Sequence, residues 1–274
     1  MKLFALLGHP LSHSFSKAFF TEKFAREKVD ACYENIDLSD IQQLPGMLRE
    51  RPDLCGFNVT SPYKEAIIPY LDFLDPEAEA VGAVNTVKMM ADGRMIGFNT
   101  DIIGIESTLT RSVRGATTGT SVTPEGSCAV PLWHLAKLSP ALILGTGGAS
   151  KAVQYVLKKH HIPYHLVSRT LGKGQFTYEA LTPEVIREHL LIINATPVGM
   201  APHINETPMI PHEAITPHHV LFDLIYNPEE TLFLRHGRKQ GAKTINGLTM
   251  LYAQAEASWS IWNARPAIFF PFQR

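Results

Sequence analysis

The chain has 274 residues, of which 45% are hydrophobic and 19% charged, a composition typical of a globular protein with room for two domains. The formal net charge of −1 argues against a protein that binds nucleic acid or an anionic membrane surface. Three cysteines without a Cys-x-x-Cys pair argue against a disulfide framework or a zinc site, and no apolar run reaches the roughly 20 residues of a membrane span, so we expect a cytoplasmic protein.

The N-terminal region predicts a buried strand that leads into a helix. Residues 3–7 form an apolar run closed by Gly8, and helical spacing begins at about Ser16. Ser14 and Ser16 therefore lie where a loop enters the helix. A serine here is often only a helix cap, but two hydroxyls at a helix N-terminus could also bind a carboxylate.

The next strand, helix and strand are predicted at 31–36, 39–49 and from Leu54 onward, a rhythm that indicates a parallel sheet. The third strand ends in a polar stretch with Asn58, Thr60 and Lys64, and Pro62 forces a turn. Such a stretch could be an edge strand with a surface lysine. It could equally bind a small hydroxylated or anionic molecule at the carboxyl end of the strand.

A hairpin is predicted around Asp92-Gly93, between the runs 81–87 and 95–101. It should bring Asn85 close to Asn99, Thr100 and Asp101. Asp101 opens a predicted helix, where a lone aspartate would most often be a cap. Residues 111–139 lack periodicity, and we interpret them as an atypical insertion or loop.

A glycine-rich turn follows the apolar strand predicted at 141–144. It consists of Gly145, Thr146, Gly147, Gly148 and Ala149, and a helix begins directly after it. Glycines let the backbone approach a pyrophosphate, and the helix N-terminus supplies amide donors, so this turn predicts a dinucleotide site. A purely structural turn is the alternative.

The next strand, at 164–167, ends in Ser168, Arg169 and Thr170, with Lys173 nearby. An NAD site usually has an acidic residue at this strand end, where it binds the ribose 2′-hydroxyl. A guanidinium suits a phosphate instead, so the sequence favours NADP over NAD.

Further strands are predicted at 191–194, from Val220 and at 243–245, followed by a strong helix over 248–262 that contains Gln254. A polar residue on a helix face is the simplest interpretation of Gln254. The 12 histidines form no ligand-like pattern, so we predict no metal site.

Together these stretches resemble the shikimate dehydrogenase family over nearly the whole chain outside 111–139. The motifs that carry the resemblance are Gly8-x-Pro10 with Ser14-x-Ser16, Asn58-Val59-Thr60-x-Pro62-x-Lys64, Ala83-Val84-Asn85-Thr86, Asn99-Thr100-Asp101, Gly145-x-Gly147-Gly148-Ala149-Ser150, Ser168-Arg169-Thr170, Asn194-Ala195-Thr196-Pro197, Asp223-x-x-Tyr226 and Gly247 through Gln254. Ser168 stands where the family usually has asparagine, and Lys173 where a second arginine is frequent.

The resemblance implies two α/β domains. A substrate domain with a mainly parallel sheet would comprise residues 1–101 plus 247–274, and a Rossmann-like NADP-binding domain would comprise residues 102–246. The implied reaction is the reversible, NADP-dependent reduction of 3-dehydroshikimate to shikimate, in a monomer or homodimer.

The resemblance also assigns site residues. Lys64 and Asp101 would be the catalytic pair, although which of them moves the proton stays open. The implied substrate-binding residues are Ser14, Ser16, Asn58, Thr60, Asn85, Asp101, Tyr226 and Gln254. The implied NADP(H)-binding residues are Gly145, Thr146, Gly147, Gly148, Ala149, Ser168, Arg169, Thr170, Lys173, Thr196, Leu224 and Gly247.

Two alternatives remain within this interpretation. One is a quinate/shikimate dehydrogenase with broader substrate or NAD use. The other is a homologue that binds shikimate without catalysis; loss of Lys64 or Asp101 would have favoured it, and both are present.

Overall fold

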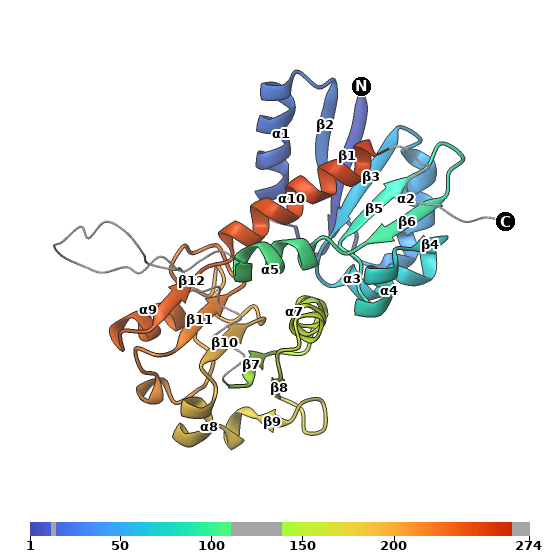
Figure 1. Cartoon of the computed structure of the whole chain (residues 1–274). Helices are drawn as coiled ribbons and strands as arrows, with labels where there is room; N and C mark the ends of the chain where they lie inside the picture. Colours follow the sequence, from blue (N-terminus) through green and yellow to red (C-terminus); the bar gives the residue numbers. More distant parts are fainter. Residues whose placement is uncertain (12–14, 111–138, 265–274) are drawn as a thin grey trace. The chain divides into compact units, whose positions relative to one another are not determined.

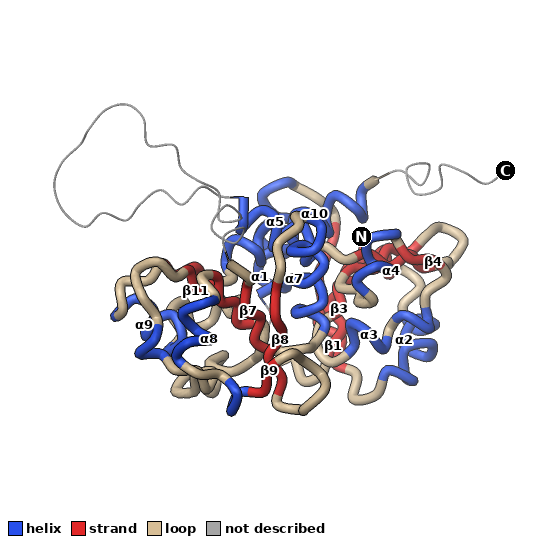
Figure 2. The backbone as a smooth tube through the Cα atoms, turned by 60° about the horizontal axis from the view of Figure 1, so that its bottom comes forward, coloured by secondary structure: helices blue, strands red, loops and turns tan. Residues whose placement is uncertain are grey.

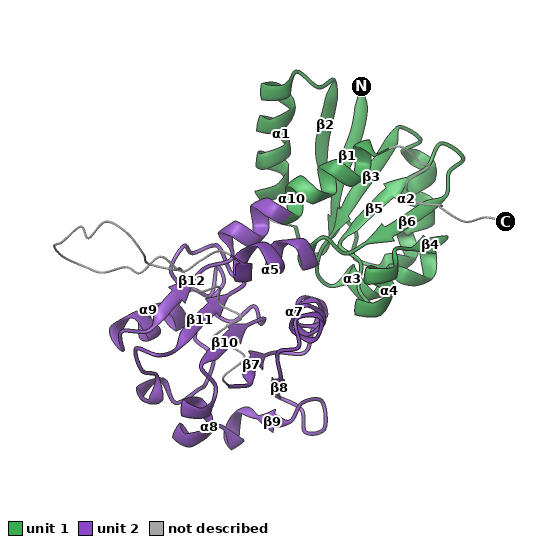
Figure 3. Ribbon diagram, viewed as in Figure 1, with its two compact units in different colours: residues 1–101, 254–274 green, residues 102–253 purple. Residues whose placement is uncertain are grey.

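The computed structural model describes residues 1–11, 15–110 and 139–264. They form two compact units, each with its own six-stranded sheet (Figures 1 and 3). Unit 1 comprises Met1–Asp101 and Gln254–Arg274, and unit 2 comprises Ile102–Ala253. The predicted fold class, α/β with parallel-rich sheets in two domains, is confirmed. Ser14 and all of the expected insertion except Ser139 lie outside the described residues.

The sheet of unit 1 has the strand order β2-β1-β3-β5-β6-β4. The strands are β1 (Lys2–Gly8), β2 (Ala31–Asp37), β3 (Leu54–Val59), β4 (Phe73–Leu74), β5 (Thr86–Met89) and β6 (Met95–Phe98). β1 is parallel to β2 and β3, and β4 is parallel to β6, whereas β5 is antiparallel to both of its neighbours. The predicted hairpin is therefore confirmed, and it is the part of this sheet that departs from parallel pairing.

The helices of unit 1 connect these strands. They are α1 (Phe15–Glu27), η1 (Ile41–Gln43), α2 (Leu44–Glu50), α3 (Tyr63–Ala66), η2 (Ile68–Tyr70) and α4 (Pro76–Val81). The single helix predicted over 39–49 is wrong in detail. Asp40 caps a short 3-10 turn, and the α-helix begins only at Leu44 because Pro45 lacks the N–H that a helix interior requires.

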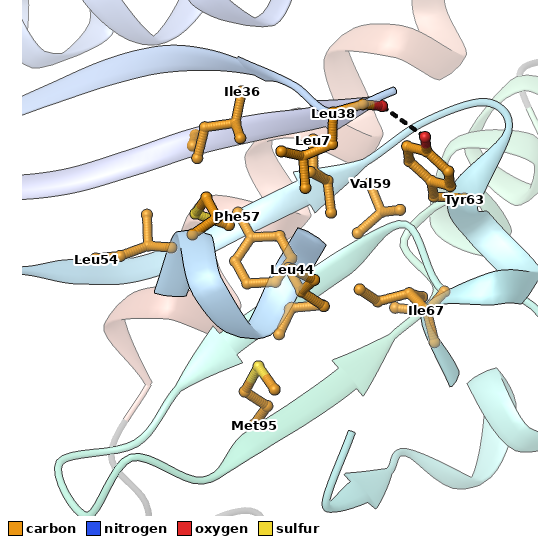
Figure 4. Close-up of a cluster of buried hydrophobic side chains, with 14 of the residues drawn as sticks. Leu7, Ile36, Leu38, Leu44, Leu54, Phe57, Val59, Tyr63, Ile67 and Met95 are labelled. Atoms are coloured by element: carbon orange, nitrogen blue, oxygen red, sulfur yellow. Dashed lines mark hydrogen bonds between the residues drawn. The ribbon is translucent and has the colours of Figure 1, made fainter. Parts of the chain in front are cut away.

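Two apolar clusters cover the two faces of this sheet. One contains Phe57 and Leu44, and Tyr63 Oη donates a hydrogen bond of 2.5 Å to the carbonyl of Leu38 at its edge (Figure 4). The other packs aromatic side chains of α1 and α10 (Leu248–Asn263) on β1 and β2. There Trp262 Nε1 donates to the carbonyl of Val87 at 3.0 Å, which fixes the C-terminal half of α10 on the sheet.

The sheet of unit 2 has the order β12-β11-β10-β7-β8-β9 and is parallel throughout. The strands are β7 (Ala141–Leu144), β8 (Tyr164–Ser168), β9 (Phe176–Thr177), β10 (Leu191–Asn194), β11 (Val220–Asp223) and β12 (Lys243–Ile245). The helices are α5 (Asp101–Thr110), which begins at the last residue of the first segment of unit 1, α7 (Gly148–Lys159), η3 (Tyr178–Ala180), α8 (Pro183–Glu188), η4 (His212–Ala214) and α9 (Leu232–Lys239).

Helices lie beside the strands of this sheet (Figure 2). Apolar residues of α8 and α9 join strand residues in one cluster, and α7 buries Ala152, Val153, Val156 and Leu157 against β7. β7 has β10 on one side and β8 on the other, so the chain reverses its direction of winding there. The carboxyl end of such a strand is where open α/β sheets bind their ligands. Within the described part of the chain, no helix combines the length and apolarity needed to cross a bilayer.

Candidate active site

Lys64 and Asp101, 37 positions apart in sequence, are in direct contact in unit 1. Lys64 Nζ donates to Asp101 Oδ2 at 2.6 Å, and the two side chains are 21% and 6% exposed. Lys64 lies in α3, directly after the turn at Pro62, and Asp101 is the first residue of α5. The contact predicted between these two residues is confirmed. Because an ammonium has three donors, two N–H groups of Lys64 have no partner among the described residues.

Asn85 fixes the other oxygen of Asp101. The backbone N–H of Thr100 donates to Asn85 Oδ1 at 2.7 Å, and this bond sets the orientation of the amide. Asn85 Nδ2 consequently donates to Asp101 Oδ1 at 2.9 Å. Both carboxylate oxygens of Asp101 therefore accept a hydrogen bond, which is the role of an ionised carboxylate. The predicted proximity of Asn85 to residues 99–101 is also confirmed.

Asn58 is buried beneath this pair, and protein groups engage both ends of its amide. Its Oδ1 accepts from Tyr33 Oη at 2.8 Å. Its Nδ2 lies 2.9 Å from Ser258 Oγ, 3.1 Å from Thr86 Oγ1 and 3.2 Å from the carbonyl of Asn85. Asn58 is thus placed to support the neighbouring polar groups from within the unit.

The other predicted substrate residues that the structure describes are Thr60, Gln254, Ser16 and Tyr226. Thr60 directly follows β3, and its backbone N–H donates to the carbonyl of Leu7 at 2.9 Å, beside the loop that follows β1. Gln254 is buried on α10, with its Oε1 at 3.5 Å from Asn85 Nδ2. Ser16 is the second residue of α1 and is hydrogen-bonded to Tyr33. Tyr226 is a half-buried residue of unit 2.

Two residues of this polar cluster were missed by the sequence analysis. Tyr33 is a buried residue of β2, a strand whose burial does not alternate, and Ser258 lies one helical turn after Gln254. A four-residue spacing from Gln254 places Ser258 on the same face of the helix, and this spacing was the available signal.

The predicted dinucleotide turn joins β7 to α7 in unit 2. Gly145 has φ of +104°, and a Cβ there would lie 2.9 Å from Thr196 Cγ2, so a side chain would be strained and crowded. Gly147 is the N-terminal cap residue of α7, and no atom of the described residues lies within 4 Å of a Cβ built on it. The first turn of α7 carries no acidic residue. The helix N-terminus therefore faces open space that suits an anionic group.

The end of β8 carries cations and no acid. Ser168 is buried, and its Oγ accepts from the backbone N–H of Thr170 at 3.1 Å. Arg169, Thr170 and Lys173 are exposed around the turn that follows. This donor set fits a ribose 2′-phosphate, whereas a 2′-hydroxyl would lack the acceptor that it usually finds there.

The other predicted cofactor residues follow the ends of neighbouring strands. Thr196 comes after β10, Leu224 after β11 and Gly247 after β12. A Cβ on Gly247 would lie 2.1 Å from the carbonyl oxygen of Leu224, so only glycine fits there. The strands that these residues follow are adjacent and parallel: β12, β11, β10, β7 and β8. The predicted cofactor residues of unit 2 therefore all lie at the carboxyl ends of the strands, on the same side of the sheet. Among the described residues, no cluster of three or more His, Cys, Asp or Glu could hold a metal ion.

Comparison with known proteins agrees with this arrangement. Residues 6–87 match the family model described as the shikimate dehydrogenase substrate binding domain. Shikimate dehydrogenase (NADP(+)) of Methanococcus maripaludis is 36% identical over 285 aligned positions, which cover 98% of this chain and 94% of the relative. The chain belongs to the shikimate dehydrogenase family.

A solved structure extends this likeness to three dimensions. It is the shikimate 5-dehydrogenase of Thermus thermophilus in complex with NADP(H) and shikimate, with a TM-score of 0.78 and 34% identity over 96% of this chain and 94% of that chain. The enzyme of Caldanaerobacter subterraneus subsp. tengcongensis, also named shikimate dehydrogenase (NADP(+)), is 33% identical over 95% of this chain. The resemblance inferred from the sequence motifs is thereby confirmed.

Proposed function

We propose that this chain catalyses the reversible, NADP-dependent reduction of 3-dehydroshikimate to shikimate. The observation that carries the proposal is the 2.6 Å contact between Lys64 Nζ and Asp101 Oδ2, held in place by Asn85. Reduction of a ketone leaves negative charge on its oxygen, which needs a proton and a positive neighbour. A partly exposed ammonium with two uncommitted N–H groups provides both.

Lys64 is the proton donor in this proposal, and Asp101 orients it. Both oxygens of Asp101 accept hydrogen bonds, one from Lys64 and one from Asn85, so this side chain is placed to hold the ammonium in position. Bound NADPH would supply the hydride. Lys64 would donate a proton to the carbonyl oxygen in the reduction and take it back in the reverse reaction.

The polar groups around this pair would orient the substrate. We assign the substrate carboxylate to the hydroxyls of Ser14 and of Ser16. The ring hydroxyls would contact the side chains of Thr60, Asn85, Asp101, Tyr226 and Gln254. Asn58 supports these contacts from below, because protein groups already engage both ends of its amide.

Unit 2 supplies the cofactor site in this proposal. The glycine turn from Gly145 to Ala149 would receive the pyrophosphate, and Arg169, with Ser168, Thr170 and Lys173, the 2′-phosphate. Thr196, Leu224 and Gly247 line the same sheet edge. We further propose that residues 1–101 plus 247–274 act as the substrate domain and 102–246 as the NADP domain, in a cytoplasmic monomer or homodimer.

An absorbance assay at the NADPH band tests the proposal directly. The purified chain should reduce NADP+ when shikimate is added, faster than it reduces NAD+ and faster than it oxidises quinate. Equal rates with quinate or NAD+ would favour the broader quinate/shikimate dehydrogenase. Binding of shikimate without any turnover would favour a non-catalytic homologue, and neither binding nor turnover would refute the proposal.

A further inference from the structure

Ser258 occupies the centre of a buried polar cluster in unit 1. Its side chain is 0% exposed, and its Oγ lies within hydrogen-bond distance of Asn58 Nδ2 (2.9 Å), Thr86 Oγ1 (2.8 Å) and Thr100 Oγ1 (3.2 Å). It also donates to the carbonyl of Gln254 at 2.9 Å. One hydroxyl of α10 thus touches residues of β3, of β5 and of the loop before α5.

The donor and acceptor roles in this cluster can be assigned. Asn58 Nδ2 can only donate and the carbonyl of Gln254 can only accept, so Ser258 accepts from the first and donates to the second. One lone pair remains for the hydroxyl of Thr86. The hydroxyl of Thr100 then donates to Thr86 Oγ1 at 3.1 Å, and the backbone N–H of Thr100 donates to Asn85 Oδ1 at 2.7 Å.

These bonds form a continuous chain between the two ends of the proposed substrate site. It begins at Ser16 and passes to Tyr33 and to Asn58. From Asn58 it reaches Ser258, then the hydroxyls of Thr86 and Thr100, passes through the backbone N–H of Thr100 to Asn85, and ends at Asp101 and Lys64. In a buried network each member limits the geometry of the next.

We propose that Ser258 is a positioning residue for substrate binding: it fixes Asn58, Thr86 and Thr100 so that Asn85 and Gln254 present their amides to the substrate hydroxyls. The proposal rests on the function proposed above. Ser258→Ala would take one acceptor from Asn58 Nδ2 and from the hydroxyl of Thr86. Thr100, whose backbone N–H sets the orientation of Asn85, would then be held less firmly.

The test compares Ser258→Ala with Ser260→Ala in the full-length enzyme. Both serines lie on α10 and donate to the carbonyl four residues earlier, Ser260 to Glu256 at 3.0 Å, but Ser260 is exposed and outside the cluster. Ser258→Ala should raise KM for shikimate by about fivefold and leave KM for NADP+ unchanged, since a net hydrogen bond contributes about 1 kcal/mol. Ser260→Ala should change neither KM.

A second variant and a stability measurement keep the outcomes separate. Ser258→Cys keeps a side chain with one heavy atom beyond Cβ, but its somewhat larger sulfur is a weak acceptor, so it should raise KM for shikimate as well. A purely structural role would lower the melting temperature of both Ser258 variants while leaving KM for shikimate at the wild-type value, and that result would overturn the proposal. An equal rise of both KM values would overturn it too. A wild-type enzyme without shikimate-dependent NADP+ reduction would instead refute the function itself.

Discussion

Lys64 combines partial exposure with a fixed, buried partner. The side chain of Asp101 is 6% exposed, and Asn85 sets its position. Asp101 therefore fixes the position of the Lys64 ammonium, which itself stays partly accessible to a ligand. Replacement by alanine removes the proton donor but none of the neutral groups proposed to bind substrate hydroxyls. We therefore expect Lys64→Ala to lower kcat by roughly 10²–10⁴-fold, with shikimate still bound, as measured by steady-state kinetics and calorimetry.

The control for Lys64→Ala is Lys2→Ala, an exposed lysine at the start of β1 in the same unit. Its removal should leave kcat unchanged. Near-normal turnover of Lys64→Ala would remove Lys64 from the mechanism, and turnover lost only through a rise in KM would make it a binding residue.

We expect Arg169 to determine the preference for NADP+ over NAD+ in the proposed site. It is exposed at the end of β8, where no carboxylate is present to accept a ribose hydroxyl. A charge-assisted hydrogen bond contributes about 1.5–3 kcal/mol, so Arg169→Ala should raise KM for NADP+ by about 10- to 100-fold. KM for NAD+ should hardly change, because NAD+ has no 2′-phosphate.

Arg187→Ala is the matched change for Arg169→Ala. Arg187 is an exposed arginine of α8 that pairs with Glu184 in the same unit. Arg187→Ala should change neither KM for NADP+ nor KM for NAD+. If Arg169→Ala raised KM for NAD+ and for NADP+ equally, the guanidinium would contact a chemical group that both cofactors contain.

At the scale of elements, two glycines of one turn should separate folding from binding. Gly145 has a positive φ, and its Cβ would approach Thr196, whereas Gly147 has φ of −80° and open space around it. Gly145→Ala should therefore destabilise unit 2 by about 1–3 kcal/mol. Gly147→Ala should leave the melting temperature unchanged but raise KM for NADP+, because the methyl would occupy the space proposed for the pyrophosphate. An unchanged KM in Gly147→Ala would place the cofactor elsewhere.

A buried lysine of β5 donates hydrogen bonds to backbone carbonyls at the C-terminal end of helix α10 and should stabilise it there. Lys88, 6% exposed on β5, donates to the carbonyls of Ile261 and Ala264, and burial lowers its pKa. Lys88→Met would leave those carbonyls without this donor, at a cost of about 1–3 kcal/mol in urea unfolding. Lys2→Met, on the exposed end of β1, should cost little. Equal stability of the two variants would contradict this role for Lys88.

The sequence predicts the long elements of this fold well because their patterns are local. β1, the hairpin of β5 and β6, the β7 turn with α7, and α10 each carry a clear period or turn signal. β4 and β9 have two residues each, too few to show alternation, and α8 is a six-residue helix. Such short pieces are decided by tertiary contacts, which no local pattern contains.

The candidate site shows the same limit at long range. The motifs identify Lys64, Asp101 and Asn85, and their proximity follows from strand ends and a hairpin. Tyr33 and Ser258 belong to no motif, and they are 225 positions apart (258 minus 33). They meet through Asn58 because α10 packs on the sheet of unit 1, a packing that the sequence alone does not specify.

For the whole molecule, the two units should respond independently to substitution. The polar cluster lies in unit 1, and the glycine turn with Arg169 lies in unit 2. Lys64→Ala should thus leave the affinity for NADP+ unchanged, and Gly147→Ala should leave the affinity for shikimate unchanged, each measured by calorimetry on the binary complex. Loss of both affinities in either variant would mean that the two sites are coupled.

The stability of unit 2 should depend on pH through His189, a buried histidine that is paired with the half-buried His165. His189 Nδ1 donates to the carbonyl of Val185 at 2.6 Å, so its Nε2 accepts from His165 Nδ1 at 2.8 Å. Burial lowers the pKa of His189, the adjacent His165 lowers it further, and the Val185 carbonyl and the charge of Glu188 oppose the shift. The folded state therefore takes up this proton at a lower pH than the unfolded chain, which does so near pH 6.5.

It follows that the unfolded state binds more protons than the folded state just below pH 6.5, so the contribution of His189 to stability is present above that pH and is lost as the pH falls. Burial raises the pKa of Asp223 to about 6, which gives the opposite slope, with stability lost as the pH rises from about 4 to 6. Comparing wild type with His189→Gln cancels the Asp223 contribution. The difference in unfolding free energy between the two proteins should shrink as the pH is lowered from about 7.5 to about 5.5 in urea titrations. A difference that stays constant over this range would mean that His189 titrates alike in both states, and one that grows would reverse the sign of its shift.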